Sequence, residues 1–354
     1  MSNRIFTRSP YWTSINGSAN DVCRVDLYIW NGDSSTSAPV TVTRSLVKPI
    51  PSSLITYCAF NIAPFLREYI DFVNEPELYN SLANVYLKQY CNVVVKKYLN
   101  NVLESSTQFM CLDGYGEYLD GYNETLQTCL LKEGTYYYYY DSTGLVSDLD
   151  KRPGHLTVDA QDPWSIKYTD LVNGATTTIN YTSTNLISCP RLYSTYWNHG
   201  NKLEILDGSS VVQATYYFYP LEESKYPVQY LDFINRYGAW QKEFLFKASR
   251  SSIALGKVNE YSHIQPSFNY DTSVGQRKVS NVNGTESIKC NTGWVDESFS
   301  DTIKQLLMSE RVLLNGKPVI LKTKNFENQK HLTDKLINYT IEFDYAYDII
   351  NTSM

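Results

Sequence analysis

The chain has 354 residues, a length that predicts two or three domains with enough material for a buried core. Hydrophobic residues make up 43%, too many for a disordered chain, and the mean hydropathy of −0.35 is too low for a membrane protein. Apolar runs such as Val93–Val95 are short, so we expect no membrane anchoring. The net charge of −6 argues against binding of nucleic acid through an extended basic surface.

Tyrosine is the unusual component of the chain. There are 31 Tyr beside 13 Phe and 6 Trp, so aromatic residues reach 14% of the total. Tyrosine favours pleated, half-buried surfaces and keeps a polar tip for water or a partner. The composition therefore predicts an extended β protein with wet contact surfaces.

The N-terminal part is predicted to contain strands separated by turns. Val25–Trp30 ends at an Asn-Gly-Asp turn, and Val40–Val47 is its expected hairpin partner. Pro64–Ile70 predicts a short helix with proline near its start, and Tyr86–Tyr98 predicts a long strand. After two Asp-Gly turns at 113–114 and 120–121, Leu130-Leu131 and the tyrosine run 136–140 predict another hairpin.

A polar stretch at 141–153, rich in Ser, Asp, Gly and Pro, predicts a domain boundary, and Pro220–Pro227 predicts a second linker. Between them lie short segments whose spacing suits a small β-sandwich. These expected strands are Leu156–Val158, Trp164–Tyr168, Thr176–Tyr181, Lys202–Leu206 and Val211–Tyr219.

The C-terminal third predicts α+β structure. Strands are expected at 230–235 and 240–248, a helix at 298–308 with Asp296 or Ser298 as its cap, and a hairpin around Asn315-Gly316. The last strand alternates strictly, with one face made of Ile337, Tyr339, Ile341, Phe343, Tyr345 and Tyr347.

The predicted fold class is therefore mainly β and multi-domain, with Ig-like or β-sandwich modules followed by a C-terminal α+β domain. The expected domains are an N-terminal β domain at 1–145, a small sandwich-like module at 146–225 and the α+β domain at 226–354.

Residues suited to catalysis or metal binding are scattered. The seven cysteines never form a CxxC pair, so we predict small buried hydrophobic residues in a reducing cytosol, without disulfides or metal. The four histidines lie far apart, and no hydrolase, nucleotide or dinucleotide motif occurs. We predict no enzyme, no catalytic residue and no cofactor. Turns explain the acidic residues at 113–124 better than calcium binding does, and solvated charge explains Glu222-Glu223 better than glycosidase chemistry does.

Several C-terminal segments resemble those of structural proteins from tailed phages that infect Bacteroidetes. The likeness is carried by Tyr230–Trp240, Asn291–Trp294, Leu313–Lys322 and Ile341–Asn351, with weaker similarity at Phe60–Ile70 and Asp113–Asn123. Ala239 stands where a second glycine is expected, a departure that affects turn flexibility alone. These segments are similar to neck or tail proteins of the crAss-like phage group.

The resemblance implies a structural virion protein that forms rings in the neck or tail, between the portal and the tail layers. Its implied partners are copies of itself, the portal and other neck or tail proteins, with genomic DNA only as passing cargo. The implied location is the virion, after assembly in the host cytoplasm. No active-site residue comes with the likeness.

Tyrosine-bearing strands are expected to make the contacts of such a ring, because tyrosine combines buried area with a hydrogen-bonding tip. We predict an interface at Tyr136, Tyr138, Tyr140, Tyr237 and Trp240. The alternative is a carbohydrate- or receptor-binding tail module, in which the 136–140 run stacks on sugar rings.

Overall fold

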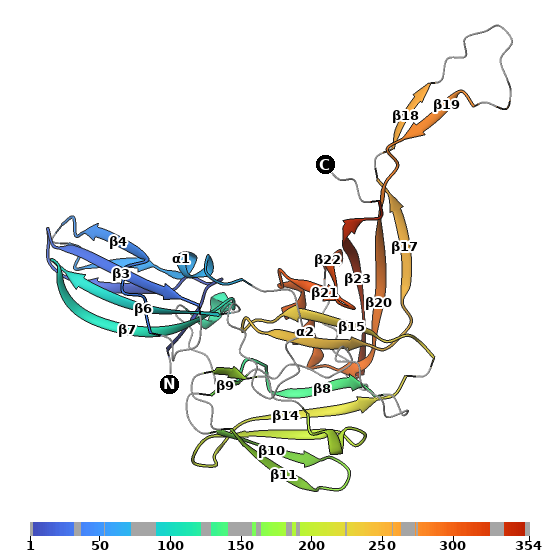
Figure 1. Ribbon diagram of the computed structural model, residues 1–354, viewed down its shortest axis with the longest axis horizontal. Coiled ribbons are helices and arrows are strands. Elements are labelled where there is room, and N and C mark those ends of the chain that lie inside the picture. Colours follow the sequence, from blue (N-terminus) through green and yellow to red (C-terminus); the bar gives the residue numbers. More distant parts are fainter. Residues whose placement is uncertain are drawn as a thin grey trace. The chain divides into compact units, whose positions relative to one another are not determined.

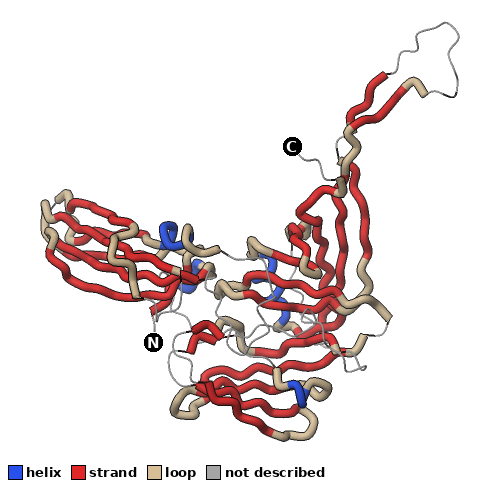
Figure 2. The backbone as a smooth tube through the Cα atoms, viewed as in Figure 1, coloured by secondary structure: helices blue, strands red, loops and turns tan. Residues whose placement is uncertain are grey.

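The computed structural model describes residues 3–31, 37–52, 54–71, 90–121, 129–140, 158–160, 164–181, 186–188, 192–223, 225–256, 258–262, 273, 275–325 and 336–350. Strands hold 56% of these residues and helices 7%, so the predicted mainly β class is confirmed (Figure 2). The predicted boundary at 141–153 lies outside the described residues.

The N-terminal strands form a five-stranded sheet in the order β1-β7-β6-β3-β4 (Figure 1). The predicted hairpin is confirmed, because β3 and β4 pair antiparallel with Val25 opposite Leu46. In contrast, β1 pairs in parallel with β7, about a hundred residues later in the chain, with Ile5 opposite Cys111. The strands of this sheet are β1 (Asn3–Phe6), β3 (Val22–Trp30), β4 (Arg44–Pro49), β6 (Tyr90–Leu99) and β7 (Val102–Leu112).

A second layer covers one face of this sheet. It consists of the antiparallel pair β2 (Trp12–Asn16) and β5 (Tyr57–Asn61), followed by the short helix α1 (Ala63–Arg67) with proline in its first turn, as predicted. The side chains between the layers form one apolar core, because alternate residues of each strand point to the same face. The core includes Ile5, Ile15, Val25, Leu27, Phe60, Leu66, Val93 and Val95.

A second five-stranded sheet has the order β11-β10-β13-β14-β8. Its strands are β8 (Gly134–Tyr139), β10 (Trp164–Asp170), β11 (Thr176–Tyr181), β13 (Asn201–Leu206) and β14 (Val212–Leu221). The hairpin predicted for 130–140 is wrong, because β8 pairs in parallel with the distant β14. The strand β14 also continues through Pro220 and Leu221, where the sequence predicted the start of a linker. A separate two-stranded pair joins β9 (Val158–Ala160) to β12 (Leu186–Ser188).

The C-terminal strands form a seven-stranded sheet in the order β16-β15-β21-β22-β23-β20-β17. Asn315 and Gly316 join β21 to β22 with φ of 51° and 74°, the left-handed pair that a type I′ turn requires. The sheet contains β15 (Gln229–Ile234), β16 (Trp240–Leu245), β17 (Arg250–Leu255), β20 (Gly284–Asp296), β21 (Val312–Leu314), β22 (Lys317–Leu321) and β23 (Leu336–Asp348). A two-stranded pair, β18 (Asn259–Ser262) with β19 (Arg277–Ser280), follows β17 along the chain.

The predicted helix is observed as α2 (Phe299–Leu307) and buries Phe299, Ile303 and Leu306. The carboxylate of Asp296 accepts a hydrogen bond from the backbone N–H of Ser298 just before the helix. Short 3-10 helices occur at Tyr118–Asp120 and Ser194–Tyr196.

Backbone contacts divide the chain into two compact units. The first contains residues 1–222, 232–243 and 308–310, and the second contains 223–231, 244–307 and 311–354. The turn of the β15–β16 hairpin and the strand residues beside it, 232–243, therefore belong to the first unit. The predicted domain boundaries at 145–146 and 225–226 stay predictions.

The alternation of β23 predicts how two substitutions differ. Phe343 is fully buried and Thr340 is exposed on the opposite face, as predicted from the sequence. Phe343→Asp places a charge in the core and should lower the free energy of unfolding by several kcal/mol, whereas Thr340→Asp should change it little. Urea denaturation of both variants measures the difference, and equal losses would show that the strand is buried on both faces.

Candidate functional site

Most residues predicted to form an interface lie inside the chain. Tyr138 is fully buried, while Tyr136 and Trp240 keep only 8% and 4% of their surface. The interface role predicted for these three side chains does not fit this structure. Tyr140 and Tyr237 are half-buried, and their interface role stays a prediction.

The buried tyrosines use both the ring and the hydroxyl within the chain. The ring of Tyr136 stacks on Phe218 of β14 with 5.4 Å between centroids, and its hydroxyl donates to the carbonyl oxygen of Lys132 at 2.6 Å. Tyr138 packs against Trp197 and donates to the carbonyl oxygen of that residue. The Tyr216 hydroxyl donates to the Leu131 carbonyl at 2.8 Å. These hydrogen bonds within the chain satisfy the tyrosine hydroxyl groups, which we had expected to bond to a neighbouring subunit.

On β8 and β14 the tyrosines that lie between the buried ones are partly exposed. The sequence analysis did not predict them as interface residues. Tyr137 lies opposite Tyr219 in the parallel register, and their ring centroids are 6.3 Å apart. Tyr219 keeps 39% of its surface exposed, and Tyr139 and Tyr217 are half-buried. We call Tyr137, Tyr139, Tyr217 and Tyr219 the outer tyrosine face. Strand alternation required that one set be buried, but the pairing with β14 decided which set.

A second candidate site joins two segments that the sequence had singled out separately. The backbone N–H of Tyr115 donates to the carbonyl oxygen of Arg236 at 2.8 Å, so the 113–121 loop lies against the 235–239 turn. The guanidinium of Arg236 binds the carboxylate of Asp120 in the same loop. Gly238 has φ of +77°, and a Cβ atom there would lie 2.7 Å from the backbone nitrogen of Gly114. A glycine is therefore required on both conformational and steric grounds.

The same turn is held by Asn235 and by an apolar cluster. The side-chain oxygen of Asn235 accepts hydrogen bonds from the backbone N–H groups of Tyr237 and Ala239, and its amide donates to the carbonyl of Leu130 at 2.8 Å. Ala239 and Tyr237 pack with Tyr90, Met110, Leu112 and Leu130. We call this contact between the loop 113–121 and the turn 235–239 the loop–turn junction.

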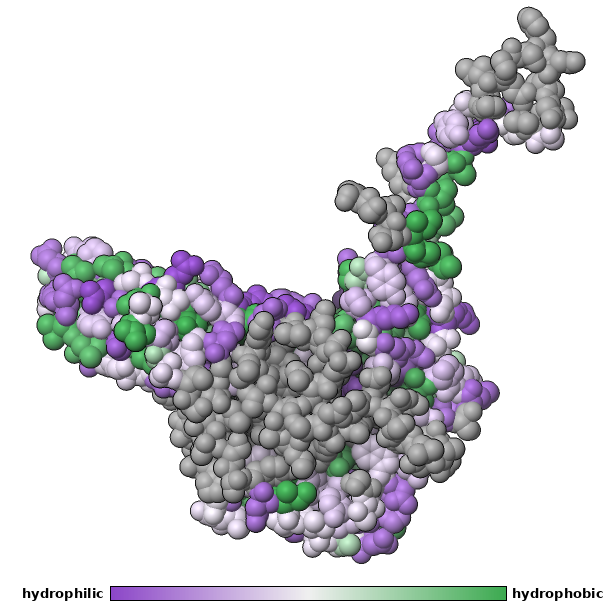
Figure 3. Space-filling view, viewed as in Figure 1, coloured by the Kyte–Doolittle hydropathy of each residue, from purple (hydrophilic) through white to green (hydrophobic). Residues whose placement is uncertain are grey.

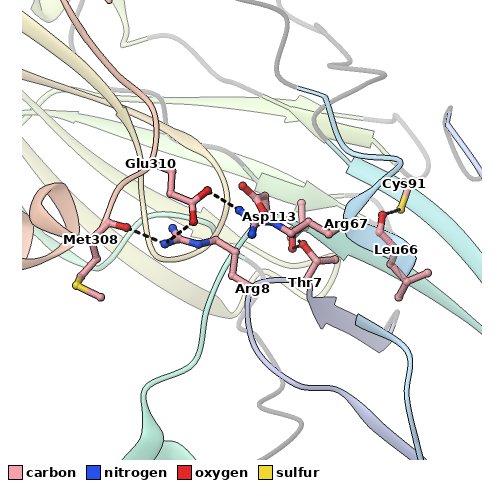
Figure 4. A network of polar contacts seen from close by, with 9 residues as sticks. Thr7, Arg8, Leu66, Arg67, Cys91, Asp113, Met308 and Glu310 are labelled. Carbon is pink, nitrogen blue, oxygen red and sulfur yellow. Dashed lines mark hydrogen bonds and ion pairs between the residues drawn. The ribbon is translucent and has the colours of Figure 1, made fainter. Parts of the chain in front are cut away.

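Ion pairs extend the junction to other segments of the first unit (Figure 4). Arg67 of α1 binds Asp113, with Nε and Oδ1 3.0 Å apart, and also binds the carboxylate of Glu310. Arg8 follows β1; it pairs with Glu310 at 3.3 Å and donates to the carbonyl of Met308 at 2.8 Å. Burial raises the pKa of the Asp113 carboxyl, and the neighbouring arginines only partly offset this rise. Because each of these charges has an opposite partner, the arrangement is suited to fastening segments together.

A further set of buried polar groups lies on β16 and the strand beside it. The ammonium of Lys242 lies 3.7 Å from the carboxylate of Asp232, and both side chains are almost completely buried. Gln241 donates a hydrogen bond to Glu243 at 2.7 Å. Burial raises the pKa of Glu243 to about 8, although the bond from Gln241 acts in the opposite direction.

His199 and Asp170 form the arrangement closest to acid–base chemistry. Nδ1 of His199 lies 2.8 Å from the carboxylate of Asp170 and 3.3 Å from the side-chain nitrogen of Asn173. Burial raises the pKa of Asp170, but hydrogen bonds with His199 and with the backbone of Asn173 and Val172 outweigh it and bring the value to about 2. The pair ties the 170–174 turn to the loop that precedes β13. His199 lies half-buried in a turn.

The cysteines behave as small hydrophobic residues. Six of them, Cys23, Cys58, Cys91, Cys111, Cys129 and Cys290, have free thiols and are buried, whereas Cys189 lies outside the described residues. Burial raises the pKa of Cys290 to about 12, which keeps the thiol protonated at neutral pH. Among the residues that the structure describes, no group of three or more His, Cys, Asp or Glu side chains is placed to hold a metal ion.

Comparison with known proteins gives no family assignment. No protein-family model matches the chain, and no curated protein matches it. Within the described ranges, no helix has the length and apolar character needed to cross a bilayer.

Gly238→Ala tests the loop–turn junction. Gly174 is a matched control, since its φ of +68° also favours glycine but a Cβ there meets nothing within 4 Å. Gly174→Ala should cost about 1 kcal/mol of stability. Gly238→Ala should cost several times as much, because its methyl group would collide with the backbone of the 113–121 loop. Urea denaturation measures both losses, and equal losses would contradict the close approach.

Glu243 predicts a dependence of stability on pH. Its pKa is about 8 in the folded chain against 4.5 when unperturbed, so the folded state keeps a proton that the unfolded state releases. The contribution of Glu243 to the free energy of unfolding should therefore be largest below pH 4.5 and should fall by a few kcal/mol as the pH rises to about 8. Glu243→Gln should flatten this decline when denaturation is measured between pH 5 and pH 8.

Glu204 supplies the control for this measurement. Its carboxylate binds Lys202 at 2.6 Å and Lys167 at 3.1 Å, and the hydrogen bond from Lys202 is the main reason that its pKa is lowered. Glu204→Gln should leave the decline between pH 5 and pH 8 in place. A decline that persists in Glu243→Gln would show that other groups cause it.

Proposed function

We propose that this chain is a structural virion protein of a tailed phage, a ring or adaptor subunit that joins portal and tail layers around the DNA passage. One observation carries the proposal. The phage-like sequence pattern includes the 113–121 loop and the 235–239 turn. These two segments meet at the loop–turn junction and hold distant parts of the chain together. These two segments therefore contribute to the internal architecture of the chain, a role that suits a structural protein.

The distribution of charged side chains supports the same proposal. Arg8, Arg67 and Arg236 each bind carboxylates of segments far away in the sequence. Such pairs lock the positions of β1, α1 and the 113–121 loop within the first unit. The mainly β architecture with several sheets is compatible with the finer proposal that the modules are immunoglobulin-like sandwiches.

In this proposal the chain works as a repeated copy in a closed ring. A ring needs two different contact surfaces on each subunit, because a heterologous contact closes by rotation. The outer tyrosine face offers one aromatic contact surface, and the half-buried Tyr140 and Tyr237 remain candidates. Neighbouring layers would be the portal and other neck or tail proteins.

The test uses purified particles of a phage whose genome encodes this chain. Mass spectrometry and immunogold labelling should find the chain in mature virions at several copies, located at the neck or tail. The proposed contacts need neither metal nor disulfide. The density of this chain in images of the particles should therefore survive treatment with EDTA and with dithiothreitol. Absence from mature particles would overturn the proposal, and loss under either reagent would overturn the contact chemistry.

A second candidate is a carbohydrate- or receptor-binding tail module, which the outer tyrosine face favours. Tyr137 and Tyr219 lie side by side on one face of the sheet, where aromatic rings can stack on a pyranose. A glycan array should then show binding that Tyr219→Ala weakens and Tyr57→Ala, at an exposed tyrosine outside the face, leaves unchanged. An array without binding would remove this candidate.

A further inference from the structure

An asparagine side chain joins the start of β20 to the residues that follow β23. Asn283 lies directly before β20, and its side-chain oxygen accepts hydrogen bonds from the backbone N–H groups of Gly284 at 2.8 Å and of Ile350 at 3.0 Å. Its side-chain nitrogen donates to the carbonyl oxygen of Ile350 at 3.0 Å and to the carboxylate of Asp348 at 3.4 Å. The amide therefore holds residues 348–350 beside β20. We call this set of contacts the Asn283 clamp.

The clamp places a nucleophile beside an electrophile. An asparagine followed by glycine closes to a succinimide when the backbone nitrogen of the glycine attacks the side-chain carbonyl carbon. The nitrogen of Gly284 lies 2.8 Å from Oδ1 of Asn283, and so it lies beside the Cγ atom that it would attack. A Cβ atom at residue 284 would lie 2.7 Å from the carbonyl oxygen of Ala254, so the close packing of the backbone requires glycine there.

Two further groups of the clamp lie where this reaction develops charge. Attack on Cγ turns Oδ1 into an oxyanion, and the N–H of Ile350 already donates to that oxygen. The bond that breaks joins Cγ to Nδ2, and the leaving nitrogen must gain a proton. The carboxyl group of Asp348 lies 3.4 Å from Nδ2 and is placed to relay that proton from water.

We propose that Asn283 is a site of self-deamidation in the folded chain. The amide nitrogen of Gly284 loses its proton to hydroxide and bonds to Cγ of Asn283, the Cγ–Nδ2 bond breaks, and ammonia leaves. Water then opens the succinimide at either carbonyl, so residue 283 becomes aspartate or isoaspartate. Ile349 and Ile350 are 51% and 53% exposed where the sheet narrows (Figure 3), so water reaches the clamp. This modification does not depend on the proposed ring function.

The other Asn-Gly steps that the structure describes in full hold their groups in different contacts. The N–H groups of Gly17 and Gly174 donate to backbone carbonyl oxygens of other residues at 2.9 and 3.0 Å. The side chain of Asn315 contacts β15, because its oxygen accepts a hydrogen bond from the N–H of Tyr230 and its nitrogen donates to Gln229. Asn315 is therefore a matched control, with the same following residue in a different arrangement.

Deamidation removes contacts that hold the residues after β23. Aspartate at position 283 has no side-chain N–H to donate to the carbonyl oxygen of Ile350, and its carboxylate would lie beside that of Asp348. A lost hydrogen bond and a like-charge contact both weaken the clamp. Residues 348–350 should therefore detach from β20 as the chain ages.

Peptide mapping by mass spectrometry tests the reaction in the full wild-type chain. During incubation at pH 8 the folded chain should convert Asn283 several-fold faster than Asn315. In concentrated urea, which removes the clamp, the two Asn-Gly steps should react at similar rates. A rate at Asn283 equal to or below that at Asn315 in the folded chain would overturn the proposal, and so would an excess at Asn283 that persists in urea.

Asn283→Asp tests the release of residues 348–350 separately. Hydrogen exchange at the backbone amides of Ile349 and Ile350 should become several-fold faster in this variant than in the wild type. The matched variant Asn315→Asp should leave exchange at these two amides unchanged. Exchange that is the same in Asn283→Asp and in the wild type would show that the amide does not hold this segment.

Discussion

The close approach of the 235–239 turn to the 113–121 loop is the contact on which the first unit depends. It requires a left-handed glycine at 238 and leaves no room for a Cβ atom between Gly238 and the backbone of Gly114. Asn235 fixes the turn from inside by bonding two backbone N–H groups of the turn and the carbonyl of Leu130. Because the loop also carries Asp113 and Asp120, the same contact positions the carboxylates that bind Arg67 and Arg236. Backbone fit and charge pairing thus support each other.

Several of the described tyrosines help to build the interior of this chain, whereas others stay partly exposed. Tyr136, Tyr138 and Tyr216 are buried and bond to carbonyl groups of nearby loops. A buried tyrosine combines a large apolar area with a fixed hydrogen bond, so it can join a sheet to an irregular segment. The outer tyrosine face is the complementary set on the β8–β14 pair, and it offers aromatic rings to a ring contact or to a sugar.

The local pattern of the sequence determined much of the fold. Strand β23, helix α2, the Asn315-Gly316 turn and most strands between 164 and 221 follow from alternation, helical spacing and turn residues, all of which act over a few neighbours. The tertiary structure alone decided the parallel pairings of β1 with β7 and of β8 with β14, since these join segments about eighty to a hundred residues apart. The β8–β14 pairing also decided which tyrosines of these two strands are buried, and the approach of Gly238 to Gly114 is a further long-range contact. The sequence marks such residues individually, but which surfaces meet depends on long-range packing that no local pattern contains.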